Sequence, residues 1–344
     1  MKIIQHEILT QTEALLKTQE LLLGHKDELC RYLRQPYRNI IFLGCGSGYM
    51  LNCSSAAMFS LHTEKKALSL AGGGVLLDLD KYINAFTDSL VIVTSRSGET
   101  SEVILVLQEM KKRTRFKTLG ILANQSCTLK SVLDFSLEIP WAYDKSVCQT
   151  CNISNFYYAL TMLYAFYTND EALEDSFAAF FRIQPEYLAA LEPDCQRIAR
   201  IGWDNVTVLA DGEICGLASA GGLAFTEICI LPGEHFNLLD YRHGPIVVAD
   251  STKLVIALLN PKEEAQQKKL ISELCDNGAF VITLGLKDQD FWGSGYHIPL
   301  HSISHFAVWG AAFFNLCQLL AFHKALVNGH DPDVPEGLNP YVKL

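Results

Sequence analysis

The sequence of 344 residues is poor in charge and in the residues that interrupt regular structure. Charged side chains make up 19% of it and apolar ones 49%, where globular proteins average about 25% and 45–50%. Glycine (23 residues) and proline (11) are too few and too irregularly spaced for a collagenous or low-complexity chain. This composition excludes an intrinsically disordered protein, and the length suggests about two packed domains.

Basic side chains are also scarce. Lysine and arginine total 28, against 38 aspartates and glutamates, which gives a formal net charge of −10. An acidic protein is a poor general binder of polyanions, so we expect no nucleic acid partner. A phosphate group would have to be held locally, by backbone amides and hydroxyl groups rather than by a broad basic surface.

Long uncharged segments, which a membrane-spanning helix needs, are missing as well. The apolar segment Ile214–Thr226 lies between Glu213 and Glu227, and Trp309–Phe322 is interrupted by Asn315 and fits a core helix. The N-terminus has charged residues and glutamines where a signal peptide has its apolar stretch. The 11 cysteines, an odd number, lie mostly in apolar segments. We therefore expect a cytoplasmic protein with reduced cysteines and no membrane partner.

In the first half of the chain, strand-like and helix-like segments alternate, with loops of small residues between them. A leading helix is expected over residues 3–34, and the predicted strands are 39–43, 89–94, 117–123 and 135–139. Residues 149–200 are expected to be helical, in two or three pieces. Such alternation is typical of a parallel sheet covered by helices on both faces.

The alternation restarts after residue 200. The predicted strands are 205–210, 253–259 and 280–286, and the predicted helices are 215–230, 263–277 and 302–328. The sequence therefore predicts an α/β protein with two doubly wound parallel sheets, each in a three-layer, flavodoxin-like arrangement. The expected parts are an N-terminal helix (1–35), a first domain (36–170), a connecting helix (171–200), a second domain (201–330) and a tail (331–344).

The loop Ser95–Thr100 (SRSGET) contains three hydroxyl groups and one glycine directly after a predicted strand. Ligands of parallel α/β sheets bind beyond the carboxyl ends of the strands, and helix N-termini attract anions. Hydroxyl donors and a close approach at Gly98 suit a phosphate group. Ordinary helix capping by Ser97 explains the same residues, so both interpretations remain open.

A second loop, Gly44–Gly48 (GCGSG), follows the predicted strand 39–43. It would lie beside the SRSGET loop at the same edge of the sheet. It lacks the G-x-G-x-x-G spacing of dinucleotide-binding folds, because Tyr49 follows its last glycine. The chain also has no G-x-x-x-x-G-K-[ST] motif, which argues against a nucleotide triphosphatase.

Three segments together resemble the sugar isomerase (SIS) family in its double-domain form. They are NIIFLGCGSGY from Asn39, LVIVTSRSGETSEV from Leu90, and Glu227 sixteen residues before His243 in DYRHGP. The resemblance covers residues 35–344 and implies two SIS domains. It is closest to the isomerase half of glucosamine-6-phosphate synthase, to tagatose-6-phosphate ketose/aldose isomerase-like proteins, and to deglycases of phosphorylated Amadori compounds.

The resemblance implies a sugar phosphate ligand held by three loops and the tail. The residues that it indicates are Gly46, Ser47, Ser95, Arg96, Ser97, Thr100, Gln149, Thr150 and His330. Arg96 stands where the family often has glutamine, and it either contacts the phosphate or faces solvent. Gln149 stands where the synthase has serine.

Glu227 and His243 are the candidate catalytic residues. A carboxylate on an apolar helix is costly unless it is paired or protonated, and burial would raise its pKa toward that of a general base. A partly exposed, purely structural glutamate is the alternative. The resemblance implies that Glu227 moves a proton between C1 and C2, and that His243 assists ring opening or protonates a leaving group. It also implies a homodimer, because in related proteins the histidine loop reaches the neighbouring subunit's site.

Two lysines of the synthase are missing from this chain. The lysine three residues before the catalytic glutamate is Ala224 here, and the Schiff-base lysine of the tail is Pro340. The segment His330–Asp333 (HDPD) instead resembles the tails of Amadori deglycases. The sequence therefore predicts an isomerase or deglycase acting on a 6-phosphosugar, with neither a metal nor an organic cofactor. A non-catalytic phosphosugar-binding regulator and a glucosamine-6-phosphate deaminase-like enzyme are the alternatives.

Overall fold

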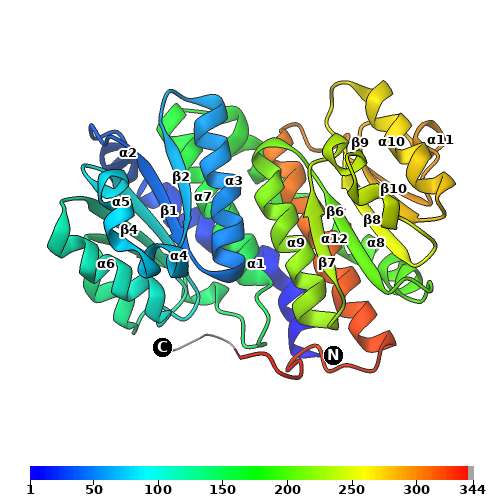
Figure 1. The fold of residues 1–344 in the computed structure, drawn as a ribbon, viewed down its shortest axis with the longest axis horizontal. Coiled ribbons are helices and arrows are strands. Elements are labelled where there is room, and N and C mark those ends of the chain that lie inside the picture. The colour runs from blue at the N-terminus through cyan, green and yellow to red at the C-terminus, as the bar shows by residue number, and fades with distance from the viewer. Residues whose placement is uncertain (340–344) are drawn as a thin grey trace. The chain divides into compact units, whose positions relative to one another are not determined.

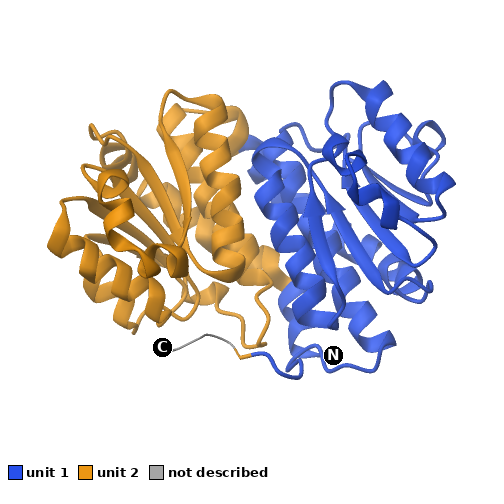
Figure 2. Ribbon diagram, viewed as in Figure 1, with its two compact units in different colours: residues 1–9, 175–338 blue, residues 10–174, 339–344 orange. Residues whose placement is uncertain are grey.

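The computed structural model describes residues 1–339, which form two compact units (Figures 1 and 2). Unit 1 contains residues 1–9 and 175–338. Unit 2 contains residues 10–174 and, of the described C-terminal residues, Asn339. Each unit has one five-stranded sheet.

The sheet of unit 2 is entirely parallel, in the order β2-β1-β3-β4-β5. Its strands are β1 (Ile40–Gly44), β2 (Ala67–Ala71), β3 (Leu90–Ser95), β4 (Lys117–Leu122) and β5 (Phe135–Glu138). The central strands β1 and β3 are continuously apolar up to residues 43 and 93 and are buried there. Continuous apolar segments are what a parallel sheet with two covered faces requires.

Besides most of α1 (Ile3–Gly24), the described residues of unit 2 form a set of shorter helices. They are α2 (Lys26–Leu33), α3 (Gly46–His62), α4 (Gly72–Leu77), α5 (Leu79–Phe86), α6 (Ser101–Arg113) and α7 (Cys151–Thr168), with short 3₁₀ turns η1 (Thr128–Val132) and η2 (Pro140–Ala142). The expected single helix over 3–34 was wrong: α1 (Ile3–Gly24) ends before α2 begins. Glycine at position 24 weakens helical continuation, and the backbone N–H of His25 is shared between two carbonyls, those of Leu21 and Leu22.

The sheet of unit 1 is also entirely parallel, in the order β10-β9-β8-β6-β7. Its strands are β6 (Asn205–Leu209), β7 (Gly233–Phe236), β8 (Lys253–Leu258), β9 (Phe280–Gly285) and β10 (Tyr296–Pro299). Counted within each unit, both sheets have the order 2-1-3-4-5 of flavodoxin-like folds. The prediction of two doubly wound α/β halves is therefore confirmed.

The remaining helices belong to unit 1, the first of them with all but its initial four residues. They are α8 (Glu171–Ala199), α9 (Cys215–Cys229), α10 (Glu264–Asp276), α11 (Gln289–Trp292) and α12 (Phe306–Val327), with 3₁₀ turns η3 (Gly212–Ile214), η4 (Leu239–Arg242) and η5 (Pro245–Val248). Helix α12 has the length and hydropathy of a membrane span, but 89% of its most apolar window is buried. It packs against α9, which confirms the prediction of a core helix.

The edge strands β2, β7 and β10 were not predicted from the sequence. Every residue of β2 is only half-buried, and β7 is just four residues long (GEHF). Edge strands face solvent along one side and need no continuous apolar segment, so their composition resembles that of a loop. Helix α12 begins at Phe306 rather than near residue 302, because the ring of His305 accepts a hydrogen bond from the backbone N–H of Ala307 (3.1 Å).

In unit 1, helix α9 crosses β7 at two glycines. A Cβ on Gly233 would overlap the carbonyl oxygen of Gly222, and a Cβ on Gly222 would lie 3.1 Å from the carbonyl oxygen of Glu234. The absence of side chains here lets the helix backbone rest directly on the strand.

We expect Gly233→Ala to lower the free energy of unfolding of unit 1 by about 1–3 kcal/mol, because helix and strand must move apart. Urea unfolding followed by tryptophan fluorescence measures this, since Trp203, Trp292 and Trp309 all lie in unit 1. Gly202→Ala is the matched control, because no atom lies within 4 Å of its added Cβ. Equal stability of the two variants would contradict the close crossing.

Candidate functional site

The SRSGET loop joins the end of β3 to the start of α6, and its own hydroxyl groups fold it. The Oγ of Ser95 accepts a hydrogen bond from the backbone N–H of Gly98 (2.9 Å), and the Oγ of Ser97 accepts one from the N–H of Glu99 (3.1 Å). Each hydroxyl oxygen that accepts a bond in this way retains an O–H that can donate. Thr100 is the residue that precedes the first turn of α6.

A neighbouring segment, residues 124–129, holds this loop in place. Gly98 has a left-handed backbone (φ 66°), and the side chain of Cys127 occupies the space that a Cβ on Gly98 would need. The Asn124 side chain donates to the carbonyl oxygen of Ser97 (3.0 Å). The Glu99 carboxylate accepts from the backbone N–H (2.7 Å) and the hydroxyl (2.9 Å) of Thr128. The loop is thus fixed on both sides of its glycine.

The GCGSG loop places Ser47 at the same edge of the sheet. Strands β1 and β3 are parallel neighbours, and both loops leave their carboxyl ends. Gly46 begins α3 with a left-handed backbone (φ 54°), so Ser47 lies in the first turn of that helix. The helix N-termini of α3 and α6 therefore both lie at this edge, and both favour negative charge.

The third predicted loop, Ser146–Thr150, is tied to the other two. The side-chain amide of Gln149 donates to the Oγ of Ser47 (3.1 Å). The Arg96 guanidinium donates from Nη1 to the carbonyl oxygen of Ser146 (3.0 Å) and from Nη2 to that of Val147 (2.9 Å). Arg96 is buried, with 5% of its surface exposed, so it does not face solvent. The structure thus brings together the three loops that the sequence indicated.

Asp144 is a site residue that sequence reasoning missed. Its carboxylate is buried and accepts hydrogen bonds from the backbone N–H groups of Thr150 (2.8 Å), Cys151 (3.1 Å) and Asn152 (3.0 Å). These amides form the N-terminus of α7. An N-cap residue normally stands directly before its helix, so an aspartate seven residues ahead of Cys151 gave no signal in the sequence.

Thr150 supports the loop from inside. It is fully buried, and its hydroxyl also lies 3.4 Å from the Asp144 carboxylate. Ser95 and Thr100 are half-buried, while Ser47 and Ser97 are buried. The arrangement offers hydroxyl and backbone donors, backed by two helix N-termini, at one edge of unit 2. Such a set of neutral donors suits a phosphate group.

Glu227 lies in the last turn of α9, in unit 1, and is half-buried. The helix runs antiparallel to the strands that it covers, so its C-terminal end lies toward the amino ends of β6 and β8. Its neighbour Thr226 lines a pocket of about 540 Å³ together with Asn205 and Lys253, the first residues of those two strands. Glu227 itself does not line this pocket.

His243 is exposed between the turns η4 and η5 of unit 1. Its backbone N–H donates to the carbonyl oxygen of Asp240 (2.9 Å), and the next residue, Gly244, has a backbone (φ 122°) that favours glycine. Arg242 anchors the turn through an ion pair with Glu273 on α10 (2.7 Å). A fixed backbone therefore presents the imidazole to solvent.

The HDPD segment closes the start of helix α1, also within unit 1. The Asp333 carboxylate accepts from the backbone N–H groups of Ile3 (3.1 Å) and Ile4 (2.9 Å), and Asp331 pairs with the Lys2 ammonium (2.8 Å). The hydrogen bond from Lys2 lowers the pKa of Asp331. His330 lies at the end of α12, where its N–H donates to the carbonyl oxygen of Ala325 (2.9 Å). Residues 340–344 of the predicted tail lie outside the described residues.

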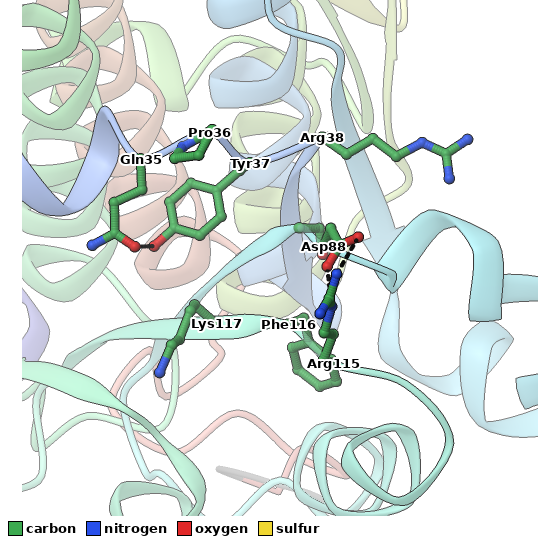
Figure 3. A pocket seen from close by; sticks show the side chains of 9 residues that line it. Gln35, Pro36, Tyr37, Arg38, Asp88, Arg115, Phe116 and Lys117 are labelled. Carbon is green, nitrogen blue, oxygen red and sulfur yellow. Dashed lines mark hydrogen bonds and ion pairs between the residues drawn. The ribbon is translucent and has the colours of Figure 1, made fainter.

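Elsewhere among the described residues, fewer polar side chains point toward one common position. A pocket of about 550 Å³ opens at the amino ends of β3 and β4 (Figure 3). Its cations point in different directions, and Arg115 is paired with Asp88 (2.6 Å). Among residues 1–339, no group of three or more histidine, cysteine, aspartate or glutamate side chains is arranged to hold a metal ion.

Comparison with known proteins gives relatives of low identity that cover nearly the whole chain. No family model matches. Over 97% of its length the chain is 23% identical to glutamine–fructose-6-phosphate aminotransferase [isomerizing] 2 of Mus musculus, and it covers 51% of that protein. The chain thus spans about half the length of the curated relatives that it matches, and the matched half is their isomerase domain.

Two solved structures have the same fold along the whole chain. Tagatose-6-phosphate ketose/aldose isomerase of Escherichia coli has a TM-score of 0.86 at 21% identity, over 99% of this chain and 96% of that one. Glucosamine-6-phosphate deaminase of Thermotoga maritima has a TM-score of 0.79 at 23% identity, over the full length of both. The resemblance to double-domain SIS proteins and the fold expected from it are confirmed.

We expect Asp333→Ala to lower the free energy of unfolding of unit 1 by about 1 kcal/mol, because two backbone N–H groups of α1 lose their acceptor. Glu336→Ala removes an exposed carboxylate from the same segment and should leave stability unchanged. Urea unfolding of the two variants measures the difference. The absence of any difference would show that the HDPD segment does not cap α1.

Proposed function

We propose that this protein is a cytoplasmic enzyme that acts on a ketose or aldose 6-phosphate, or on its amino (fructosamine-type) derivative. The observation that supports it best is the joining of three loops at one edge of unit 2. There Ser47, Ser95 and Ser97 gather beside the N-termini of α3 and α6, and Gln149 is bonded to Ser47. Neutral donors at helix N-termini recognise a phosphate without a basic surface.

The proposal gives each loop a distinct task. Ser95, Ser97 and Thr100 hold the phosphate, because their loop begins a helix and carries the most hydroxyl groups. Ser47, with the backbone of Gly46, and Gln149 contact the phosphate and the sugar from the neighbouring loops. Thr150 and Arg96 support these loops from inside, since both side chains are buried. His330 stands at the base of the tail and belongs to the same proposal.

Glu227 acts as the general base and His243 as the general acid. In an isomerisation, Glu227 removes the proton on one of the carbons C1 and C2 and returns it to the other through an enediol, while the histidine transfers protons at oxygen. In a deglycase reaction, one group removes a C1 proton and returns it at C2, which leaves an imine at C1. Water then adds to C1, and the other group protonates the amine as the C1–N bond breaks. An imidazole, with an unperturbed pKa of about 6.5, serves as either acid or base near neutral pH. Neither reaction needs a metal or an organic cofactor.

We expect Glu227→Gln to lower kcat on the true substrate by about a thousandfold with little change in KM, because the amide cannot accept the proton. Turnover is measured on fructose 6-phosphate, glucosamine 6-phosphate and fructosamine 6-phosphates, with isomer formation, ammonia release and amine release followed separately. These products distinguish isomerase, deaminase and deglycase activities.

Glu186→Gln, on the exposed face of α8, is the matched control and should turn over at the rate of the unaltered protein. Full activity of Glu227→Gln would refute the assignment of the base. Binding of a sugar phosphate without turnover of any substrate would favour the regulatory alternative.

We further propose that the protein is a homodimer joined near His243. Val247 and Val248 of η5 are 83% and 52% exposed, and Leu239 of η4 is 39% exposed. Three exposed apolar side chains around one candidate catalytic residue form a surface that a second copy would cover. His243 would then lie next to the active site of the second copy rather than in open solvent.

We expect the unaltered protein to sediment as a dimer and Val247→Asp to sediment as a monomer, because a carboxylate would be buried in the interface. Leu77→Asp is the matched control: Leu77 on α4 of unit 2 is 89% exposed, and its substitution should leave the dimer intact. Analytical ultracentrifugation measures both. A dimer that survives Val247→Asp would place the interface elsewhere.

A further inference from the structure

We propose that Arg96 and Asp144 are positioning residues that fix the Ser146–Thr150 loop against the SRSGET loop and thereby set the affinity for the sugar part of the ligand. We call this pair and its hydrogen bonds the brace. The inference rests on the proposed function for its ligand. The brace itself consists of hydrogen bonds within unit 2 and can be tested without any ligand.

Arg96 connects the two loops in a way that few side chains allow. It stands between the two serines of the SRSGET loop. Its two terminal nitrogens donate to the carbonyl oxygens of the consecutive residues Ser146 and Val147. A planar guanidinium presents parallel donors that span two acceptors, whereas a glutamine amide has one NH₂ group and lysine has a single ammonium. An arginine at this position therefore holds the neighbouring loop through its backbone.

Asp144 fixes the other end of the same loop. The helix α7 begins directly after Thr150, and its first amides would otherwise form a second anion site at this edge of unit 2. The buried carboxylate of Asp144 accepts from three of those amides, at 2.8, 3.1 and 3.0 Å. A buried internal carboxylate thus accepts from three amides at the N-terminus of α7.

The brace determines which groups the loop offers to a ligand. Two carbonyls of the loop are bonded to Arg96, and its last amide, that of Thr150, is bonded to Asp144. The loop then presents the side chain of Gln149, which is bonded to Ser47 (3.1 Å). Ser146 is itself locked, since its hydroxyl donates to the carbonyl oxygen of Cys148 (2.9 Å). Loosening the brace therefore displaces Gln149 first. The SRSGET loop keeps its own bonds to residues 124–129, through the Ser97 carbonyl and the Glu99 carboxylate.

Because the two loops are supported separately, loosening the brace should change the affinities for two ligands by different factors. Under the proposed function, fructose 6-phosphate contacts both the SRSGET loop and the Ser146–Thr150 loop. Inorganic phosphate contacts chiefly the SRSGET loop. We expect Arg96→Gln to raise the Kd for fructose 6-phosphate about tenfold, the equivalent of one lost hydrogen bond. The Kd for inorganic phosphate should rise by less than about threefold. Arg96→Lys should recover part of the sugar affinity, because an ammonium reaches one of the two carbonyls.

Isothermal titration calorimetry gives both constants, and hydrogen exchange of residues 144–152 reports on the loop without a ligand. Arg96→Gln and Asp144→Asn should both speed exchange of the amides of residues 150–152, while exchange in β1 stays unchanged. Arg115→Gln is the matched control, since it removes an exposed arginine of unit 2 from its pair with Asp88. It should change neither the ratio of the two constants nor the exchange.

The outcomes separate the brace from the proposed function. An unchanged ratio of the two constants in Arg96→Gln, with unchanged exchange, would overturn the brace. Faster exchange in the variants of a protein that binds no sugar phosphate would overturn the proposed function and leave the brace as a structural device. Should Arg96→Gln not fold, Gln149→Ala carries the ligand test, and equal affinity for fructose 6-phosphate in that variant would overturn the inference.

Discussion

The parallel pairing of β1 with β3 is the constraint on which the candidate phosphate site depends. Because β1 lies between β2 and β3, the connections after β1 and β3 lead in opposite directions along the sheet, and ligands of open α/β sheets bind at such a switch point. Ser47 and SRSGET lie at this point because each directly follows one of the two strands. The third loop reaches the same place from the chain before α7, and hydrogen bonds from Arg96 and Gln149 join it to the others.

Unit 1 repeats this topology but not its chemistry. The loop after β6 is Ala210–Ile214, and the one after β8 is Leu259–Glu263, so neither contains a serine or threonine. The first of them carries Asp211, which accepts a hydrogen bond from the backbone N–H of Leu238 (3.1 Å), and the second carries Asn260, which is bonded to Gln267. The loops of unit 1 that correspond to the proposed anion-binding loops of unit 2 are thus bonded to internal partners. A shared fold leaves room for two different tasks, and Glu227 and His243 lie outside these loops.

The central strands and the loops that follow them could be predicted from the sequence, because burial on both faces demands continuous apolar segments. The apolar segments 39–43 and 89–94 predict β1 and β3 in this way, and serine and glycine predict the turns after them. Asp144 could not be found, because it bonds to amides six to eight residues further along the chain. The role of Arg96 depends on two carbonyl groups about 50 residues away, and carbonyls leave no mark in a sequence. Capping of α1 by Asp333 joins the two ends of the chain and was equally invisible.

A net charge of −10 is compatible with the proposed phosphate ligand, because the donors at the candidate site are neutral hydroxyls and backbone amides. A surface with excess carboxylates repels a free dianion over a distance of about 8–10 Å at physiological salt, beyond which counter-ions screen it. Backbone amides, hydroxyls and helix ends act within hydrogen-bond distance, where that repulsion is outweighed by direct contacts. The one arginine in the SRSGET loop donates to the carbonyls of Ser146 and Val147, and a buried aspartate caps α7 nearby. The two buried charges of opposite sign support the same loop, so charge at this edge is used to position neutral donors.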